Sequence, residues 1–206
     1  NKKSAKPHQP TKAEGKAPNP DYTAEILRLY HMQTEQDRAY FLNRGIPAEL
    51  IEKYKLCVVN DGGRRAVLPI WSGGKVTYYT VRALENQKPR YKNTPGPAPL
   101  FNIDYIRQAS GSDLIIITEG IFDALSIEAE GHKAIALGGV EHAGKLIKAI
   151  EENPEAKKII FFTAFDNDEP GREAAAKLPF KALQIPAQHK DVNEWHRAEP
   201  GAIKKT

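Results

Sequence analysis

The chain has 206 residues, enough for one large domain or two small ones that each bury a core. Its single cysteine excludes an intrachain disulfide framework and a cysteine-rich zinc site. No apolar stretch is long enough to cross a bilayer, and no signal-peptide pattern is present. We therefore expect a cytoplasmic protein that makes no contact with a membrane.

The net charge of +4 hides a division along the chain. Residues 1–20 carry five lysines and one glutamate among Pro and Ala, which predicts a disordered basic linker. Residues 21–110 hold 13 basic and 9 acidic side chains, whereas residues 111–206 hold 12 basic and 16 acidic ones. A basic half beside an acidic half suggests a polyanion bound on one side and metal ions on the other.

Residues 21–110 should form a small α+β lobe. Residues 24–44 combine apolar and charged side chains in a pattern that predicts one or two helices, and Pro47 suits the first turn of a short helix ending near Tyr54. Residues 85–99 are polar and rich in proline, which predicts a loop. Three short strands, the last two joined in a hairpin by a Gly-Gly turn, are expected at residues 57–59, 65–70 and 76–84.

Residues 111–206 alternate between strands and helices. The strands are expected at residues 114–118, 134–137, 159–165 and 182–185, with helices at 121–130, 143–152 and 171–178. Repeated βα units imply a parallel sheet with helices on both faces. We therefore predict an α/β fold of Rossmann-like type, preceded by the smaller α+β lobe.

Acidic side chains gather where these strands end. Asp166 and Asp168 follow the third strand, and an extended chain would point both to one side. Glu119 follows the first strand, Asp123 lies one helical turn beyond it, and Asp191 follows the fourth. Five carboxylates at one edge of a sheet repel each other without cations, and their oxygens suit Mg²⁺. For Asp123 or Asp191 alone, a helix N-cap or turn role remains open.

A basic run precedes this acidic region. Residues 64–92 hold seven basic side chains against one acid, Glu85. Tyr91 lies between two of them and could stack on a base or sugar. The run indicates a nucleic-acid-binding face, while a solvated loop that is charged by chance remains the alternative. The basic residues are Arg64, Arg65, Lys75, Arg82, Lys88, Arg90 and Lys92.

Several motifs resemble known families. The sequences TEGIFD at 118–123 and DNDEPG at 166–171 resemble the two acidic motifs of the TOPRIM fold, which primases and topoisomerases share. The sequences FLNRGIP at 41–47 and PRYKNTP at 89–95 look like the catalytic core of the DnaG-type bacterial primase. KDVNE at 190–194 is similar to phage and plasmid primases, so a mobile element or phage is the expected source. The resemblance covers about residues 36–196.

The resemblance implies the catalytic core of a DNA primase, a nucleotidyltransferase that makes RNA primers on single-stranded DNA from nucleoside triphosphates with Mg²⁺ or Mn²⁺. It implies partners outside this chain, a replicative helicase or a fused helicase or zinc domain. By position, the catalytic residues are Glu119, Asp123, Asp166 and Asp168, and the metal ligands are Glu119, Asp166, Asp168 and Asp191. The nucleic-acid or nucleotide contacts are Arg44, Arg82, Arg90, Tyr91, Lys92 and Asn93.

Some points stay open at the level of sequence. Glu119 could serve as metal ligand or as general base. Lys92 departs from the family, which commonly has an apolar residue there. A TOPRIM nuclease and a non-catalytic module that binds single-stranded nucleic acid are the alternative functions.

Overall fold

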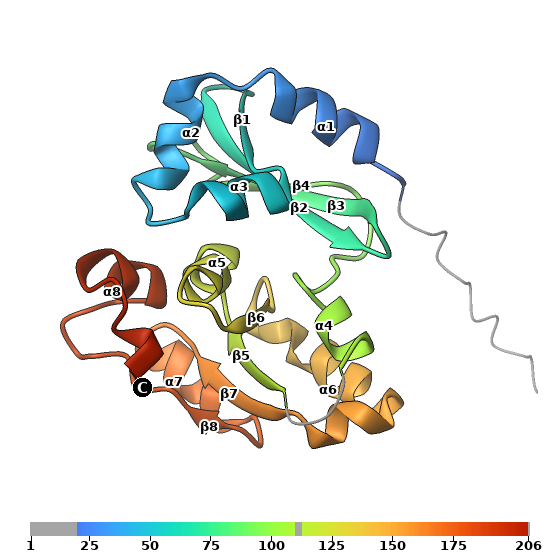
Figure 1. Cartoon of the computed structure of the whole chain (residues 1–206), viewed down its shortest axis with the longest axis vertical. Coiled ribbons are helices and arrows are strands. Elements are labelled where there is room, and N and C mark those ends of the chain that lie inside the picture. The colour runs from blue at the N-terminus through green and yellow to red at the C-terminus, as the bar shows by residue number, and fades with distance from the viewer. Residues whose placement is uncertain (1–19, 110–112, 206) are drawn as a thin grey trace, which may run out of the picture.

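The computed structural model describes residues 20–109 and 113–205, which form two lobes, each built on a four-stranded sheet (Figure 1). The expected linker at residues 1–20 lies outside the described residues, except for Pro20. The proposed boundary between residues 110 and 111 also falls outside them, so the domain limits stay predictions. Within the described ranges, no helix combines the length and apolarity needed to cross a membrane.

The first sheet is antiparallel, with its strands side by side in chain order. The helices α1 (Thr23–His31), α2 (Glu35–Leu42) and α3 (Ala48–Tyr54) precede it, as the pattern of residues 24–54 predicts. The strands are β1 (Cys57–Asn60), β2 (Arg64–Ser72), β3 (Lys75–Ala83) and β4 (Tyr91–Asn93).

Strand β4 corrects the prediction of an uninterrupted loop at residues 85–99. Its three residues pair with β3 along the edge of the sheet, with Tyr91 opposite Arg82 and Asn93 opposite Thr80. The flanking prolines conceal so short a strand in the sequence. Because paired residues share a face, Tyr91 and Asn93 extend the face of β3 that carries Arg82 and Thr80.

The second sheet is parallel, in the order β6-β5-β7-β8. Its strands are β5 (Leu114–Thr118), β6 (Lys133–Ala136), β7 (Ile160–Ala164) and β8 (Lys181–Ala182). Its helices are α5 (Ile121–Ala129), α6 (Ala143–Glu152), α7 (Glu169–Ala176) and α8 (Val192–Ala198), and the short α4 (Asp104–Arg107) leads into it. Three-residue or five-residue 3₁₀ turns lie at Val140–His142, Pro154–Lys158 and Ile203–Lys205.

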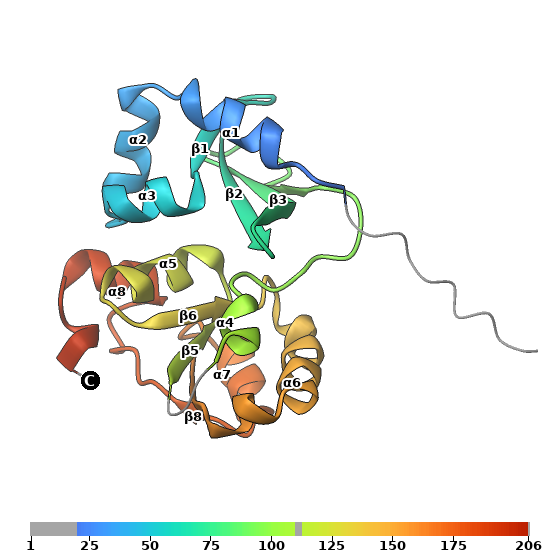
Figure 2. The same ribbon diagram turned by 45° about the vertical axis from the view of Figure 1, so that its right-hand side comes forward.

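Both faces of this sheet are covered, which confirms the predicted α/β architecture. Ile116 packs into a core that includes side chains of α5 and α8 and reaches the first sheet. Ile115 and Ile117 point the other way, into a second core with Leu146 of α6. The apolar run of β5 is therefore the expected sequence of a strand buried on both sides. Figure 2 shows α5 and α8 between the second sheet and the first lobe.

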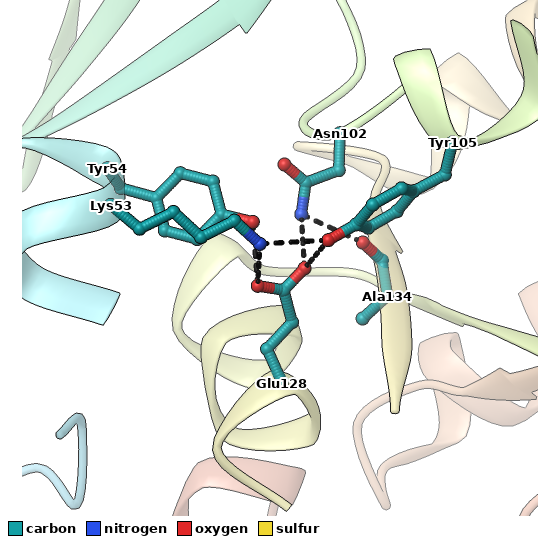
Figure 3. A network of polar contacts seen from close by, with 6 residues as sticks. All are labelled: Lys53, Tyr54, Asn102, Tyr105, Glu128 and Ala134. Atoms are coloured by element: carbon teal, nitrogen blue, oxygen red, sulfur yellow. Dashed lines mark hydrogen bonds and ion pairs between the residues drawn. The ribbon is translucent and has the colours of Figure 1, made fainter. Parts of the chain in front are cut away.

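One buried carboxylate joins the two lobes (Figure 3). Glu128 of α5, whose side chain is only 3% exposed, accepts hydrogen bonds from Tyr54 Oη at 2.7 Å and Lys53 Nζ at 2.9 Å, both on α3. It also accepts from Tyr105 Oη at 2.6 Å and Asn102 Nδ2 at 2.9 Å, which lie between the sheets in sequence. Four donors on one carboxylate fix the orientation of α5 against α3.

A second junction ties the turn after α2 to α8. Arg44 donates from Nη1 to Asn193 Oδ1 at 2.9 Å, and Asn193 Nδ2 donates to the Arg44 carbonyl at 2.9 Å. The His196 ring contacts the Gly45 carbonyl through Nε2 at 2.9 Å and Glu130 through Nδ1 at 2.6 Å. These contacts set the distance between the first lobe and the carboxyl edge of the second sheet.

Candidate active site in the cleft between the sheets

A cavity of about 530 Å³ lies between the lobes. Its upper wall is one face of the first sheet, where residues two apart on β2 and β3 point the same way. Its lower wall is the carboxyl edge of the second sheet together with the starts of α5 and α8. The upper wall includes Leu68, Ile70, Tyr78, Thr80, Arg82, Tyr91 and Asn93.

Carboxylates from three elements line the lower wall. Glu119 follows β5, Asp166 follows β7, and Asp191 begins α8. Asp123, in the first turn of α5, also faces the cavity although it is only 8% exposed. The structure thus brings four of the five expected acidic residues to one cavity. Asp168 is not among the residues that line it, but its charge still acts on Glu119 and Asp166.

The acidic groups disturb one another's ionisation. Burial raises the pKa of Asp123 to about 7, and the charge of Asp191 adds to the shift. Burial, followed by the charge of Asp166, raises the pKa of Glu119. Burial, followed by the charge of Asp191, raises the pKa of Asp166, and Lys190, whose Nζ lies 3.6 Å from Asp166 Oδ2, opposes that shift. The lower wall therefore favours any cation that enters.

Three of the five carboxylates accept hydrogen bonds from backbone N–H groups, and two of these three cap helices. Asp168 Oδ1 accepts from Gly171 N at 2.9 Å and Asp191 Oδ1 from Glu194 N at 2.8 Å, so both cap helices, α7 and α8. The N-cap role left open for Asp191 is therefore confirmed. For Asp123 it is wrong, because Gly120 occupies the N-cap of α5. Each cap engages one of two carboxylate oxygens.

The expectation that Asp166 and Asp168 point to one side depends on an extended chain, and strand β7 ends before it reaches either residue, so the shared side stays a prediction. Strand β7 ends at Ala164, two residues before Asp166, and Asp168 has already turned to cap α7. Side-chain alternation applies only while the chain stays extended. Asp166 lines the cavity, whereas Asp168 caps α7 and is not among the lining residues.

Two glycines, Gly120 and Gly171, allow close approach to the acidic residues here. A Cβ at Gly171 would overlap the Asp166 carbonyl oxygen, and a Cβ at Gly120 would lie 2.7 Å from Asp123 Oδ2. Any larger residue would displace these acidic side chains or the loop that carries Asp166.

The donor set fits Mg²⁺ or Mn²⁺ in chemistry, because carboxylate oxygens are the ligands that hard divalent cations prefer. Within residues 20–109 and 113–205, no three His, Cys, Asp or Glu side chains stand close enough to form a ready-made ligand group. Mg²⁺ at phosphate-transfer sites is usually bound by one or two carboxylates plus waters and substrate phosphates. The open arrangement of Glu119, Asp166 and Asp191 is compatible with that mode.

Five of the six expected nucleic-acid or nucleotide contacts line the cavity, including Arg44 and Asn93, and Lys92 does not. Arg82, Arg90 and Tyr91 line the cavity, and Arg82 Nε donates to Tyr91 Oη at 3.0 Å. Lys92 lies on the opposite face, where Nζ pairs with Asp61 at 2.6 Å beside a second cavity next to Val81. The family's apolar preference at this position has a physical reason, since this face lies toward α1 and the sheet's apolar core.

Most of the basic run lies elsewhere. Arg64 pairs with Asp37 at 2.6 Å and Lys75 with Asp21 at 3.3 Å. Arg65 is only 1% exposed and donates to backbone carbonyls, including that of Pro89 at 2.8 Å. Counting the basic residues of a segment therefore overestimates how many of them can bind nucleic acid, because several form ion pairs or hydrogen bonds within the lobe.

Sequence reasoning missed several residues of the cavity. Glu141 lines it just beyond the Gly-Gly turn after β6, and its charge helps raise the pKa of Glu119. The same strand-end rule that singles out Glu119 could have found it. Lys190 adjoins Asp191 in a motif already noted. Phe122 lies inside the first acidic motif, TEGIFD, and also lines the cavity. An aromatic residue directly before Asp123 could have been recognised as a candidate for this site.

Comparison with known proteins supports this geometry. Residues 116–196 match the Toprim-like family. A DNA primase of Thermotoga maritima is 31% identical over 159 residues, which are 68% of this chain and 27% of that protein. The chain spans 27–29% of the length of the curated relatives it matches.

Solved structures of primases match most of this chain in fold. The primase fragment of the bacteriophage T7 primase-helicase is 25% identical, with a TM-score of 0.62 over 80% of this chain and 71% of that one. The E. coli primase catalytic core is 19% identical, with a TM-score of 0.64 over 88% of this chain and 76% of that one. The family match and these structures together give the chain a Toprim-like region at residues 116–196 and the fold of a DnaG-type primase catalytic core.

Proposed function

We propose that this chain is the catalytic core of a DNA primase, a nucleotidyltransferase that makes RNA primers on single-stranded DNA. The observation that carries the proposal is the single cavity in which Glu119, Asp166 and Asp191 face Arg82 and Tyr91 across two sheets. A cavity with one basic wall and one acidic wall can concentrate a polyanion and divalent cations in the same space. The mobile-element source stays a prediction.

The two walls have different tasks in this proposal. Arg82, Arg90 and Arg44 bind phosphates of template or nucleotide without reading sequence, and Tyr91 offers a ring for stacking. The lower wall concentrates negative charge that Mg²⁺ or Mn²⁺ neutralises, and such an ion, when bound, stabilises charge on the attacking and leaving oxygens. Asp123 accepts the Asn193 N–H at 3.0 Å and so holds α8, with Asp191 at its start, against α5.

The test is an incubation of the chain with single-stranded DNA, labelled ribonucleotides and Mg²⁺ or Mn²⁺. Short labelled RNA that depends on template and metal supports the primase. Shortened DNA would indicate a TOPRIM nuclease, and shifted but unchanged DNA a binding module. Either of these outcomes, without RNA, contradicts the proposal, provided that the chain is also tested beside the neighbouring domains of its parent protein.

A further inference from the structure

Arg44 and Arg82 come from different elements of the first lobe but share one acceptor. Arg44 Nε donates to Tyr40 Oη at 3.1 Å, and Arg82 Nη1 donates to the same oxygen at 3.1 Å. Tyr40 lies on α2 and Arg82 on β3, so the hydroxyl bridges the helix and the sheet. The two guanidinium groups are thereby held side by side at the wall of the cavity.

An aromatic ring from the second lobe packs against both guanidinium groups. The Phe122 ring centroid lies 4.4 Å from Arg44 Cζ and 5.3 Å from Arg82 Cζ, both within cation–π range. The Tyr40 ring meets Phe122 edge to face, with centroids 6.2 Å apart and an interplanar angle of 82°. Phe122 is 6% exposed and directly precedes Asp123 in sequence, so the ring links the arginines to the acidic wall.

This arrangement leaves positive charge unbalanced. Within the described ranges, 20–109 and 113–205, neither Arg44 nor Arg82 forms an ion pair with a carboxylate. Burial lowers the pKa of Arg44, and the nearby charge of Arg82 acts in the same direction. Each guanidinium has five N–H donors, and the bonds to Tyr40, Asn193 and Tyr91 engage two on each. Two like charges held side by side in a cleft repel each other, and an anion bound between them would relieve that repulsion.

We propose that Phe122 and Tyr40 are positioning residues that hold Arg44 and Arg82 together to receive one phosphate group. This inference rests on the proposed function, because the phosphate belongs to single-stranded DNA or to a nucleoside triphosphate. The ring and the hydroxyl remove the rotational freedom of two long side chains before the ligand arrives, so less entropy is lost on binding. Neither residue contacts the reacting atoms.

The first measurement compares Phe122→Leu with wild type for binding of a mixed-sequence single-stranded oligodeoxyribonucleotide and, separately, of ATP. Leucine keeps an apolar side chain but removes the ring quadrupole from two cations. We expect affinity for the phosphate source to fall about five- to thirtyfold. For the oligonucleotide, the slope of log affinity against log salt should fall by about 0.7, the loss of one phosphate contact on a single strand. The ligand that responds identifies the source of the phosphate.

Three further variants separate positioning from packing. Phe161→Leu is the matched control, since Phe161 is similarly buried and pairs with Phe180 in the other core, and it should leave affinity unchanged. Phe122→Tyr keeps a ring and should stay near wild type. When Phe122→Leu is added to the double variant Arg44→Gln/Arg82→Gln, affinity should change by less than about twofold relative to that double variant. The side chains that Phe122 positions are then already absent.

A second readout needs no ligand. In wild type, the Nε–Hε signals of Arg44 and Arg82 should show ring-current shifts in NMR spectra. These shifts should shrink in Phe122→Leu, where only the rings of Tyr40 and Tyr91 remain beside the guanidinium groups. Arginine signals at positions typical of free side chains, or equal losses of affinity in Phe122→Leu and Phe161→Leu, would overturn the inference. If wild type binds neither the oligonucleotide nor ATP, the phosphate site is overturned, even where NMR shows that Phe122 holds the two arginines in place. A chain that binds DNA but makes no primers refutes the primase alone.

Discussion

At the scale of single residues, the most perturbed group of the cleft is Asp123. It is buried, accepts the Asn193 N–H at 3.0 Å, and lies near the charges of Asp191 and Asp166. Its pKa rises from 3.8 to about 7. Between these values the folded state binds more protons than the unfolded state, so the free energy of unfolding falls as pH rises through this window.

Asp123→Asn should therefore stabilise the chain at pH 8. Asparagine can accept the same N–H bond but carries no charge, and we expect a gain of about 2–4 kcal/mol in the free energy of unfolding. The difference should shrink as pH falls and close by about pH 3, where the aspartate is protonated in both states. Urea titrations at pH 8, 6 and 3 measure it, with Glu173→Gln on the exposed side of α7 as control. A variant less stable than wild type at pH 8 would show that the carboxylate has a favourable partner.

Single residues also mark where sequence reasoning succeeds. Glu119 and Asp166 could be placed in one site because each follows a largely buried strand whose apolar run the sequence shows clearly, whereas the strand before Asp191, β8 (Lys181–Ala182), is short and exposed. The role of Asp168 as a cap could not be predicted, since capping depends on where β7 ends, and the sequence shows no sharp end at Ala164. The face of Lys92 was hidden because β4 itself was unrecognised.

At the scale of elements, strand alternation makes Lys92 and Arg82 a matched pair. Both lie in one basic run, but Arg82 lines the cavity and Lys92 pairs with Asp61 on the opposite face. We expect Arg82→Gln to weaken single-stranded DNA binding about fivefold or more and to make it less salt-dependent. Lys92→Gln should change the affinity by less than about twofold. Salt titrations of oligonucleotide binding measure both, and an equal loss in the two variants would contradict this assignment of faces.

The contact between α3 and α5 depends on Glu128. Its carboxylate accepts from Lys53, Tyr54, Asn102 and Tyr105, and Glu128→Gln would replace the charge and turn one acceptor into a donor facing donors (Figure 3). We expect the free energy of unfolding to fall by about 1.5–3 kcal/mol. Glu152→Gln on α6 is the control, because its ion pair with Lys148 is long and exposed, and its unfolding midpoint should match wild type. Equal midpoints for both variants in chemical denaturation would refute the role of Glu128 as a junction.

Elements were predictable to the extent that their own residues specify them. The strands β5, β6 and β7 and the helices α5 and α6 follow the sequence pattern closely, because continuous apolar runs and helical spacing are local signals. Strand β4 forms only because β3 offers an edge to pair with. The contacts that join the lobes, such as Arg44 with Asn193, connect residues far apart in sequence, so no local sequence pattern predicts them.

At the scale of the whole molecule, an antiparallel and a parallel sheet contribute different residues to one cavity. The antiparallel sheet presents Arg82 and Tyr91, and the parallel sheet presents Glu119 and Asp166. The two junctions through Glu128 and Asn193 keep these walls at a constant separation. The basic first half and acidic second half of the sequence predict one basic and one acidic wall. Only the fold shows which charged residues face each other across the cavity.

The most direct test of this arrangement is metal-dependent primer synthesis by Asp166→Asn combined with Asp168→Asn. Asparagine caps helices as well as aspartate does, so α7 should persist while the oxygens for Mg²⁺ lose their charge. We predict that synthesis falls at least about a hundredfold with Mg²⁺, while binding of single-stranded DNA remains within about twofold of wild type. Undiminished synthesis in the double variant would contradict the claim that the acidic edge of the second sheet binds the catalytic metal.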